Sequence, residues 1–370
     1  MVRKKILFVS DTFYPRVDGI VRFMGETYKY LNSDFDIKFL VPKLDGVEKI
    51  VRDKKMKVIY SPTFNFTIAE FKPSRPVRKT IRDAVDWADV VFVNTPGGTL
   101  GASSVYAAQG KKRLIGYAHT IDWELFPFAI GRKSVARLLK PIFRRIYSNL
   151  DIILAPDKMI VDSYKKAGVK SECKIVPLNA DQNRFKENLF DRLIIRKDLG
   201  VSGNFVIGFH GRLSKEKNVK LLVDSFKVFR KKRPKSVLLV LGDGPERDKL
   251  DGEGIISTGF VSDPEKYLRA MDVYVFLSKT ETSALSLMEA ISSGVPVVTS
   301  DAGLIPTYVN SRTGIVLKKS QLKRELVVRA IDMVYKSPVK SKLKSVGAKL
   351  FTDSRNWEDI ANDLKRTFED

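Results

Sequence analysis

Two glutamates that stand eight residues apart, Glu281 and Glu289, have types and spacing that could bind a ligand. Glu281 comes soon after an apolar run, Val273–Leu277, that predicts a strand, and Glu289 lies within the helix predicted next. The turn between strand and helix would aim backbone N–H groups at a ligand, and the start of a helix favours an anion. The two carboxylates could accept hydrogen bonds from sugar and ribose hydroxyls. The pattern therefore indicates a nucleotide-sugar site, with two solvent-exposed glutamates as the simpler alternative.

A second pair of groups, Arg212 and Lys217, follows the apolar run Phe205–Gly211. Gly211, at the end of that predicted strand, would let a ligand approach the backbone closely. Arginine offers a planar fork and lysine a point charge, so the two could neutralise a diphosphate from two sides. The alternative is a basic surface loop that contacts only water.

These motifs resemble those of a known enzyme family. The pair Glu281 and Glu289, followed by Gly294-Val295-Pro296-Val297-Val298, is similar to the signature of retaining, nucleotide-sugar-dependent glycosyltransferases of family 4, the group 1 type. The order Gly211-Arg212-Leu213 and then Glu216-Lys217 resembles a second motif of that family. The resemblance extends over nearly the whole chain and is nearest in character to members that glycosylate lipids.

The resemblance implies a fold and an activity. The fold is α/β of the GT-B type, in which two Rossmann-like domains face each other across a deep cleft. The activity is transfer of a sugar from a UDP- or GDP-linked donor to a hydroxyl acceptor, with retention of configuration and without a metal or other cofactor. A membrane lipid or a lipid-linked glycan is the candidate acceptor.

The resemblance also implies roles for single residues. Arg212 and Lys217 would contact the donor diphosphate, Glu289 the ribose and Glu281 the transferred sugar. Gly19 follows the first predicted strand, where a glycine turn could approach the donor phosphate at the start of a helix. The donor-binding set that the resemblance implies is Gly19, Gly211, Arg212, Lys217, Glu281, Ser283, Ala284, Leu285 and Glu289. The catalytic set is His119, Arg212, Lys217 and Glu281.

His119 ends the predicted strand Leu114–His119, so its imidazole should face the cleft rather than the core. Its segment, Gly116-Tyr117-Ala118-His119-Thr120, resembles a family element whose histidine lies against the donor sugar. The resemblance implies a positioning and charge-stabilising role for His119, with Asp122 as a neighbour. The second histidine, His210, is expected in the core or at the edge of the cleft.

The elements that must position these groups alternate between apolar, β-branched runs and amphipathic stretches, which is typical of parallel α/β proteins. The strands predicted in the first half are Lys5–Ser10, Asp36–Val41, Lys57–Tyr60, Val90–Asn94, Leu114–His119 and Ile152–Ala155. Those predicted in the second half are Phe205–Gly211, Ser236–Gly242, Ile255–Gly259, Val273–Leu277, Pro296–Ser300 and Gly314–Leu317. The charged segment between Val176 and Ser202 is the expected linker. We expect an acceptor-binding domain at 1–180, a donor-binding domain at 181–350, and a helix at 351–370 that crosses back to the first domain.

Composition limits the class of protein. A chain of 370 residues suggests two domains, and no run approaches the eighteen apolar residues that a membrane-spanning helix needs. The apolar run after Met1 is too short for a signal peptide. A single cysteine, Cys173, excludes an internal disulfide framework, so we expect a cytoplasmic protein, with peripheral membrane attachment as a further possibility. The formal net charge of +23 implies anionic partners.

The segment from Gly131 to Asn149 carries six basic residues and no acidic one. Its apolar residues, from Val135 to Tyr147, recur at helical spacing and predict a helix that packs on the core. The basic residues expected to bind an acceptor or an anionic membrane are Arg132, Lys133, Arg137, Lys140 and Arg144. The alternative is a core-packing helix whose basic face contacts only water. The two readings predict opposite results with anionic vesicles.

Other functions fit less well. A nucleotide-sugar 2-epimerase of the same fold remains an alternative, and a nucleic-acid-binding protein would account for the charge but lacks a recognition motif. No Gly-x-Gly-x-x-Gly follows the first predicted strand, which disfavours a nicotinamide dehydrogenase. No metal site is expected, because Asp34-Phe35-Asp36 precedes a strand instead of following one.

Overall fold

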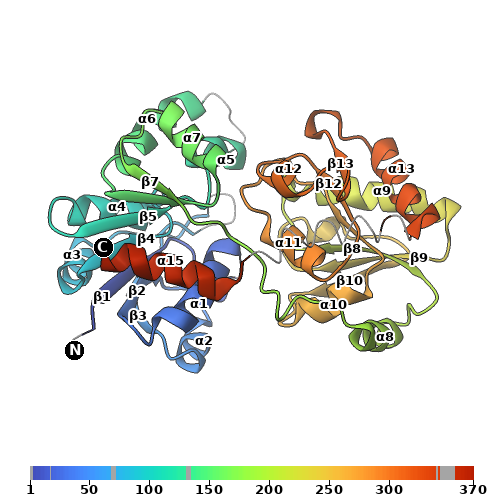
Figure 1. Cartoon of the computed structure of the whole chain (residues 1–370), viewed down its shortest axis with the longest axis horizontal. Helices are drawn as coiled ribbons and strands as arrows, with labels where there is room; N and C mark the ends of the chain where they lie inside the picture. The colour runs from blue at the N-terminus through green and yellow to red at the C-terminus, as the bar shows by residue number, and fades with distance from the viewer. Residues whose placement is uncertain (1–2, 17, 68–71, 131–134, 339–340, 342–354) are drawn as a thin grey trace. The chain divides into compact units, whose positions relative to one another are not determined.

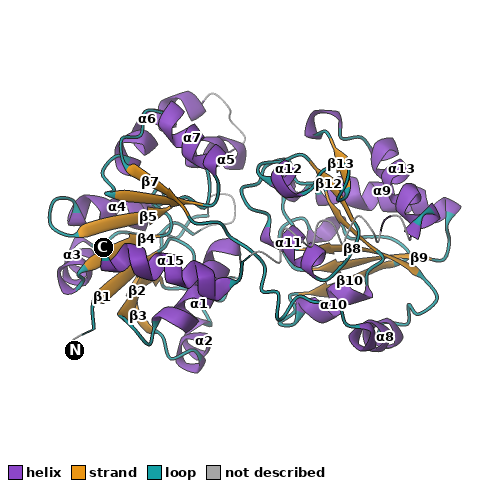
Figure 2. Ribbon diagram, viewed as in Figure 1, coloured by secondary structure: helices purple, strands orange, loops and turns teal. Residues whose placement is uncertain are grey.

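The computed structural model describes residues 3–16, 18–67, 72–130, 135–338, 341 and 355–370. It divides into two compact units. Unit 1 comprises Met1–Pro177 and Glu358–Asp370, and unit 2 comprises Leu178–Trp357. Each unit is a parallel sheet covered by helices (Figures 1 and 2).

The sheet of unit 1 has the strand order β3-β2-β1-β4-β5-β6-β7 within the described residues. Its strands are β1 (Lys5–Val9), β2 (Asp36–Pro42), β3 (Lys57–Ser61), β4 (Val90–Val93), β5 (Arg113–Tyr117), β6 (Ile152–Ala155) and β7 (Glu172–Ile175). The central strands β1 and β4 are almost wholly buried, because helices cover both faces of a parallel sheet. That burial explains why they read as continuous apolar runs.

The helices of unit 1 include one from the far end of the chain. They are α1 (Gly19–Leu31), α2 (Val47–Asp53), α3 (Arg78–Trp87), α4 (Thr99–Ala108), α5 (Asp122–Ile130), α6 (Val135–Tyr147), α7 (Lys158–Lys166) and α15 (Trp357–Glu369). Phe368 of α15 packs edge-on against Phe8 of β1 and Phe92 of β4, with ring centroids 6.2 and 5.2 Å apart (Figure 1). These aromatic contacts fasten the C-terminal helix to the sheet of unit 1.

Unit 2 repeats the same design with the order β10-β9-β8-β11-β12-β13. Its strands are β8 (Phe205–His210), β9 (Ser236–Leu241), β10 (Ile255–Gly259), β11 (Val273–Phe276), β12 (Val297–Ser300) and β13 (Ile315–Leu317). Its α-helices are α8 (Leu189–Asp198), α9 (Val219–Lys232), α10 (Pro264–Ala270), α11 (Leu285–Ser292), α12 (Ile305–Tyr308) and α13 (Arg324–Lys336). Short 3₁₀ turns lie at Lys215–Lys217, Arg247–Lys249 and Lys319–Gln321.

The predicted α/β class with two parallel sheets is confirmed, and all twelve predicted strands occur within two residues of their expected ends. The sequence patterns missed β7, because this strand at the edge of the sheet is half exposed and contains Glu172 and Lys174 instead of an apolar run. The segment expected to be a linker contains α8. In an order such as that of unit 2, ligands bind beyond the carboxyl ends of the strands, where the order reverses between β8 and β11.

Candidate active site

Lys217 and Glu281 form an ion pair beyond the carboxyl ends of β8 and β11. The Lys217 side chain is 19% exposed and that of Glu281 is 9% exposed. The Lys217 ammonium also lies 5.1 Å from the ring centroid of Phe276, the last residue of β11. The structure therefore brings together two of the predicted groups, a cation and a carboxylate, in a largely dehydrated setting where charge interactions are strong.

Arg212, the second predicted cation, is held by the carboxylate of Glu216, for which the sequence motifs predicted no role. Its guanidinium donates to Glu216 Oε1 at 2.5 Å, and the Ser214 hydroxyl donates to the same oxygen at 2.5 Å. Burial alone would raise the pKa of Glu216, but the charge of Arg212 and the bond from Ser214 outweigh it and lower that pKa. Glu216 therefore stays ionised and orients Arg212.

The backbone of Glu216 also connects this loop to the loop that carries Glu281. The Glu216 carbonyl accepts hydrogen bonds from the Lys279 N–H, at 2.8 Å, and from the Ser278 hydroxyl, at 3.2 Å. The two motifs recognised in the sequence are thus one hydrogen-bonded assembly. Glu216 could have been suspected from its place between Arg212 and Lys217, because a buried cation pair needs a counter-charge when no anion is bound.

The start of α11 lies beside this assembly. Ala284 precedes the helix in the left-handed conformation, with φ 49° and ψ 56°. Leu287 is the first residue whose N–H bonds back to the Ala284 carbonyl, at 2.9 Å, which leaves the N–H groups of Leu285 and Ser286 outside the helical bonding pattern. The hydroxyl oxygen of Ser283 is buried and makes no hydrogen bond within the described residues. Such a helix start is suited to bind an anion.

Glycine at position 303 is required for the Glu281 turn to lie where it does. Gly303 has φ +56°, and a Cβ atom placed on it would lie 1.9 Å from the Glu281 carbonyl oxygen. The loop after β12 therefore supports the Glu281 turn by direct backbone contact. The Leu304 N–H donates to the Thr282 carbonyl at 3.1 Å and adds a second connection between the two loops.

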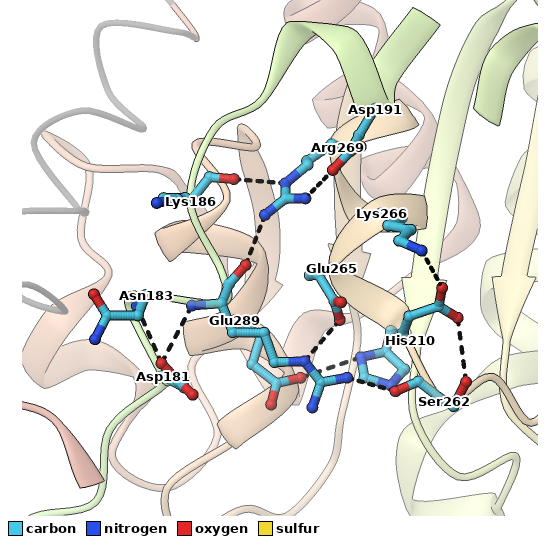
Figure 3. Close-up of polar contacts among 12 residues, drawn as sticks. Asp181, Asn183, Lys186, Asp191, His210, Ser262, Glu265, Lys266, Arg269 and Glu289 are labelled. Atoms are coloured by element: carbon cyan, nitrogen blue, oxygen red, sulfur yellow. Dashed lines mark hydrogen bonds and ion pairs between the residues drawn. The ribbon is translucent and has the colours of Figure 1, made fainter. Parts of the chain in front are cut away.

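Glu289 is buried more deeply than Glu281 and contacts His210. The His210 Nδ1 atom is 3.3 Å from Glu289 Oε2, and Figure 3 shows the two side chains facing each other. Glu289 is 2% exposed. The Tyr274 hydroxyl donates to the His210 carbonyl at 2.8 Å and holds the end of β8 in place. Glu289 thus lies in the helix whose start follows Glu281, and His210, the last residue of β8, is half-buried beside it.

His119 in unit 1 has surroundings different from those expected. It is 8% exposed and contacts the rings of Phe23 and Tyr117, at centroid distances of 4.9 and 4.3 Å. Its Nε2 atom lies 3.4 Å from Asn94 Oδ1. Burial lowers the pKa of His119 to about 3. A neutral imidazole can still position a hydroxyl, but the structure does not favour the predicted stabilisation of charge, because aromatic rings dehydrate the site.

This burial predicts a pH dependence of stability. In the unfolded chain His119 should titrate near 6.5. Below that pH the imidazole is protonated in the unfolded state but stays neutral in the folded state. The free energy of unfolding should fall by about 1.4 kcal/mol for each pH unit below 6.5, and this loss should continue toward pH 3. Urea unfolding of the wild type and of His119→Asn at several pH values measures this, and the variant should lack that part of the slope. Equal slopes would contradict the buried, neutral assignment.

Asp122 is close in sequence to His119 but has other partners. Its carboxylate accepts hydrogen bonds from the hydroxyls of Thr120 and Tyr147, both at 2.6 Å. Burial raises the pKa of Asp122, although these two bonds oppose the rise. Because Tyr147 is the last residue of α6, Asp122 fastens the loop after β5 to the end of α6.

At Gly19, where a donor phosphate was predicted to bind, the Asp18 carboxylate already occupies the start of the helix. Gly19 is the first residue of α1, and the Asp18 carboxylate caps this helix by accepting from the N–H groups of Ile20 and Val21, at 3.0 and 2.9 Å. The Thr12 hydroxyl holds the other Asp18 oxygen at 2.8 Å. A donor phosphate could use this helix start only after Asp18 moves, so the structure gives Gly19 less support than the turn before α11.

The predicted basic helix exists as α6, with Pro141 inside it. Phe143, Ile146 and Tyr147 are buried as expected, but the expectation that the whole apolar stripe packs on the core is wrong, since Leu138 is 73% and Ile142 55% exposed. These two residues lie one turn apart on a side of α6 that the described residues of unit 1 leave exposed. Of the basic residues predicted there, Lys140 and Arg144 are exposed. Arg132, Lys133 and the side chain of Arg137 lie outside the described residues.

Neither a cluster of metal ligands nor a membrane-spanning helix occurs in the described ranges. No group of three or more His, Cys, Asp or Glu side chains gathers there as a metal site would require. No helix in those ranges is long and apolar enough to cross a membrane.

Sequence comparisons and structure comparisons both relate this chain to glycosyltransferases. A family model described as glycosyl transferases group 1 matches residues 204–336, and one described as Glycosyltransferase Family 4 matches residues 17–184. An alpha-monoglucosyldiacylglycerol synthase from Acholeplasma laidlawii is 27% identical over 365 residues, which is 89% of this chain and 88% of that protein. The enzyme of the same name from Streptococcus pneumoniae is 24% identical, over 80% of this chain and 70% of its own.

Solved structures share the architecture. HepE from Anabaena, solved with UDP and glucose, has a TM-score of 0.82 at 18% identity and covers 99% of this chain and all of its own. WaaG, a glycosyltransferase of lipopolysaccharide biosynthesis, has a TM-score of 0.72 at 13% identity, covering 98% of this chain and 99% of its own. The resemblance that the sequence motifs indicated is therefore confirmed at the level of the fold, which is of the GT-B type.

Proposed function

The chain belongs to the glycosyltransferases of group 1 and family 4, and from this premise we propose that it transfers a sugar from a UDP-linked donor to a hydroxyl of a membrane lipid, with retention of configuration. Use of a nucleotide sugar follows from the family. The nucleotide, the stereochemistry and the acceptor are the parts that we propose. Support for UDP comes from HepE, a structural neighbour solved with UDP-glucose.

The observation that carries the proposal is the hydrogen-bonded assembly of the loops that carry Arg212, Lys217 and Glu281, together with the start of α11 that follows Glu281. When the bond between the sugar and the diphosphate of the donor breaks, negative charge develops on the leaving diphosphate. Two cations and an anion-binding helix start would stabilise that charge, and fixed donors of this kind are usually the largest catalytic contribution. Lys217 would then exchange its bond to Glu281 for one to a phosphate oxygen.

The reaction balances without a protein nucleophile. The acceptor oxygen forms a bond to the anomeric carbon as the bond from that carbon to the phosphate oxygen breaks. The departing phosphate oxygen can take the proton of the acceptor hydroxyl, and Glu281, released by Lys217, can accept a hydrogen bond from the transferred sugar. This route would leave the new bond on the same face as the old one.

Nucleotide binding is the first test of the function. UDP and UDP-glucose should raise the unfolding temperature of the chain, because a ligand at 100 times its dissociation constant stabilises the folded state by about 2.7 kcal/mol. A thermal-shift panel of UDP, GDP, ADP and uridine measures this, with uridine as the control that lacks the diphosphate. A shift with uridine equal to that with UDP would contradict a site built around the diphosphate.

The acceptor proposal rests on the relatives named as synthases of a glucosylated diacylglycerol and on the outer face of α6. Lys140, Arg144 and Arg145 of this helix are exposed, and so are Leu138 and Ile142. Arg145 lies on the same side of α6 as Leu138 and Ile142, whereas Lys140 and Arg144 project from the opposite side of the helix. Exposed apolar side chains with basic residues around them match the acyl chains and the headgroups of an anionic leaflet. We therefore propose peripheral attachment to a membrane through α6.

Reversing two of these charges should weaken attachment. Each basic residue near an anionic surface contributes about 1 kcal/mol, so Lys140→Glu with Arg144→Glu should lower affinity for anionic vesicles by roughly 30-fold or more. Co-sedimentation at low and high salt measures it. Lys231→Glu with Lys235→Glu, on exposed residues of unit 2, makes the same change in net charge and should have a smaller effect. Equal losses in both variants would show that only net charge matters and would contradict the proposal.

A further inference from the structure

Helix α8 of unit 2 carries an apolar face that no described part of the unit covers. Leu189 and Phe190 are 70% and 71% exposed, Leu193 is 60% and Ile194 is 40% exposed. Their spacing places the four side chains along one side of the helix. Exposed apolar residues that occur singly are ordinary, but a contiguous group of four marks a binding surface.

The opposite side of α8 packs on the unit through half-buried Ile195 and is bonded to it by two arginines. The Arg192 guanidinium donates to the carbonyls of Arg269 and Met271, at 2.9 and 2.8 Å. The Arg196 guanidinium donates to the Ala270 carbonyl at 2.9 Å and to the Asp272 carboxylate at 3.1 Å. Turning the apolar face inward would break these charge-assisted bonds. Two arginines therefore hold this side of α8 on the unit, and four of the helix's five large apolar side chains face out.

The N-terminal end of α8 is also fastened. Arg269 of α10 pairs with Asp191 of α8 and donates to the Lys186 carbonyl at 2.6 Å, as Figure 3 shows. Figure 1 places α8 at the rim of unit 2, next to α10, against which it packs. The helix presents its apolar face on a rigid support, so binding there would not first require the helix to order.

The charges on α8 identify the occupant. Lys197 lies one turn beyond Leu193 and Ile194 on the same side, and it is exposed. The neighbouring exposed Asp198 lies further round the helix. The partner that fits this face is apolar over the four side chains and anionic where it meets Lys197. A second copy of this chain would bring two net charges of +23 together, which disfavours self-association.

We propose that the face of α8 formed by Leu189, Phe190, Leu193, Ile194 and Lys197 inserts into the interface of an anionic lipid bilayer. Leucine and phenylalanine on one side, with a lysine in line, are typical of helices that lie in that interface. The inference rests on the proposed function, because a lipid acceptor requires the enzyme to work at a membrane. It adds a second membrane contact, separate from α6, and places it in unit 2, the unit that carries the proposed diphosphate site.

The test is vesicle binding by the full chain with Phe190→Ser and Leu193→Gln. Both side chains face out, so the variant should unfold at the wild-type temperature or above it. In co-sedimentation with phosphatidylglycerol-rich vesicles, its affinity should be at least about tenfold lower than that of the wild type, and the loss should persist at high salt because apolar burial is not screened. The control, Tyr106→Ser with Met333→Gln, removes side chains that are 47% and 59% exposed elsewhere and should bind within about twofold of the wild type.

Unchanged vesicle binding by the α8 variant would overturn the proposal. The proposal would also be overturned if sedimentation velocity showed the wild type to be a dimer and the α8 variant to be a monomer that binds vesicles normally. The face of α8 would then bind a second copy of the chain. The α8 variant should keep the thermal shift with UDP. A wild type without that shift would refute the proposed donor, whereas vesicle binding needs no donor, so the two failures can be told apart.

Discussion

Replacing Arg212 by alanine should lower kcat/KM for sugar transfer by roughly 100- to 1,000-fold and abolish the thermal shift with UDP. Removing one donor aimed at developing charge typically costs 2.7 to 4 kcal/mol of transition-state stabilisation. The variant also leaves the Glu216 carboxylate without its guanidinium, 2.5 Å from where the cation stood, so the site would repel a diphosphate. Lys217→Ala should have a similar effect, since Glu281 would lose its ammonium partner.

Steady-state kinetics and the UDP thermal shift measure these losses together. Arg324→Ala is the matched control, because Arg324 is an exposed arginine in an ion pair with Glu325 at 3.0 Å. The control should keep normal kinetics. Arg212→Lys should recover part of the UDP shift, since it restores the charge but not the planar fork. Normal donor affinity in Arg212→Ala would mean that the diphosphate binds elsewhere.

Gly303→Ala should destabilise unit 2 by about 2 to 4 kcal/mol and weaken UDP binding as well. Alanine in the left-handed region costs about 1 to 2 kcal/mol, and a Cβ atom at 1.9 Å from the Glu281 carbonyl oxygen would force the backbone to move. The displaced turn carries Glu281 and leads into α11, so the damage reaches the donor site. Urea unfolding and the UDP thermal shift of the same variant measure the two effects.

Gly200→Ala separates strain from contact. Gly200 also has a left-handed backbone, with φ +66°, but a Cβ atom there would meet no atom within 4 Å. This control should cost only the backbone term, about 1 to 2 kcal/mol, and should leave UDP binding unchanged. If Gly303→Ala behaved like Gly200→Ala in both measurements, the loop after β12 would not support the Glu281 turn.

The strands and the donor motifs could be predicted from the sequence because each rests on a local pattern. Buried parallel strands such as β1 and β4 are uninterrupted apolar runs. Arg212 and Lys217 follow one such run, and Glu281 follows another. Since the carboxyl ends of β8 and β11 are neighbours, the sheet order brings these loops together. The strands and the two donor motifs could therefore each be identified from the spacing of residues near to one another in the sequence.

The features that could not be predicted depend on contacts between distant segments. The neutral state of His119 results from Phe23 of α1 and Tyr117 of β5, and no local pattern places Phe23 there. The apolar residues of α8 have ordinary helical spacing, which predicts burial. Their exposure follows from Arg192 and Arg196, whose carbonyl partners lie more than 70 residues away. Periodicity shows that a helix has two faces, but it does not show which face the rest of the fold will cover.

A crystal structure of the chain with bound UDP-glucose tests the central claim most directly. We predict that the diphosphate lies within hydrogen-bonding distance of the Arg212 guanidinium and the Lys217 ammonium, at the start of α11. In that structure Lys217 should have exchanged Glu281 for a phosphate oxygen. A diphosphate bound elsewhere, with Lys217 still paired to Glu281 and Arg212 still paired to Glu216, would contradict the account.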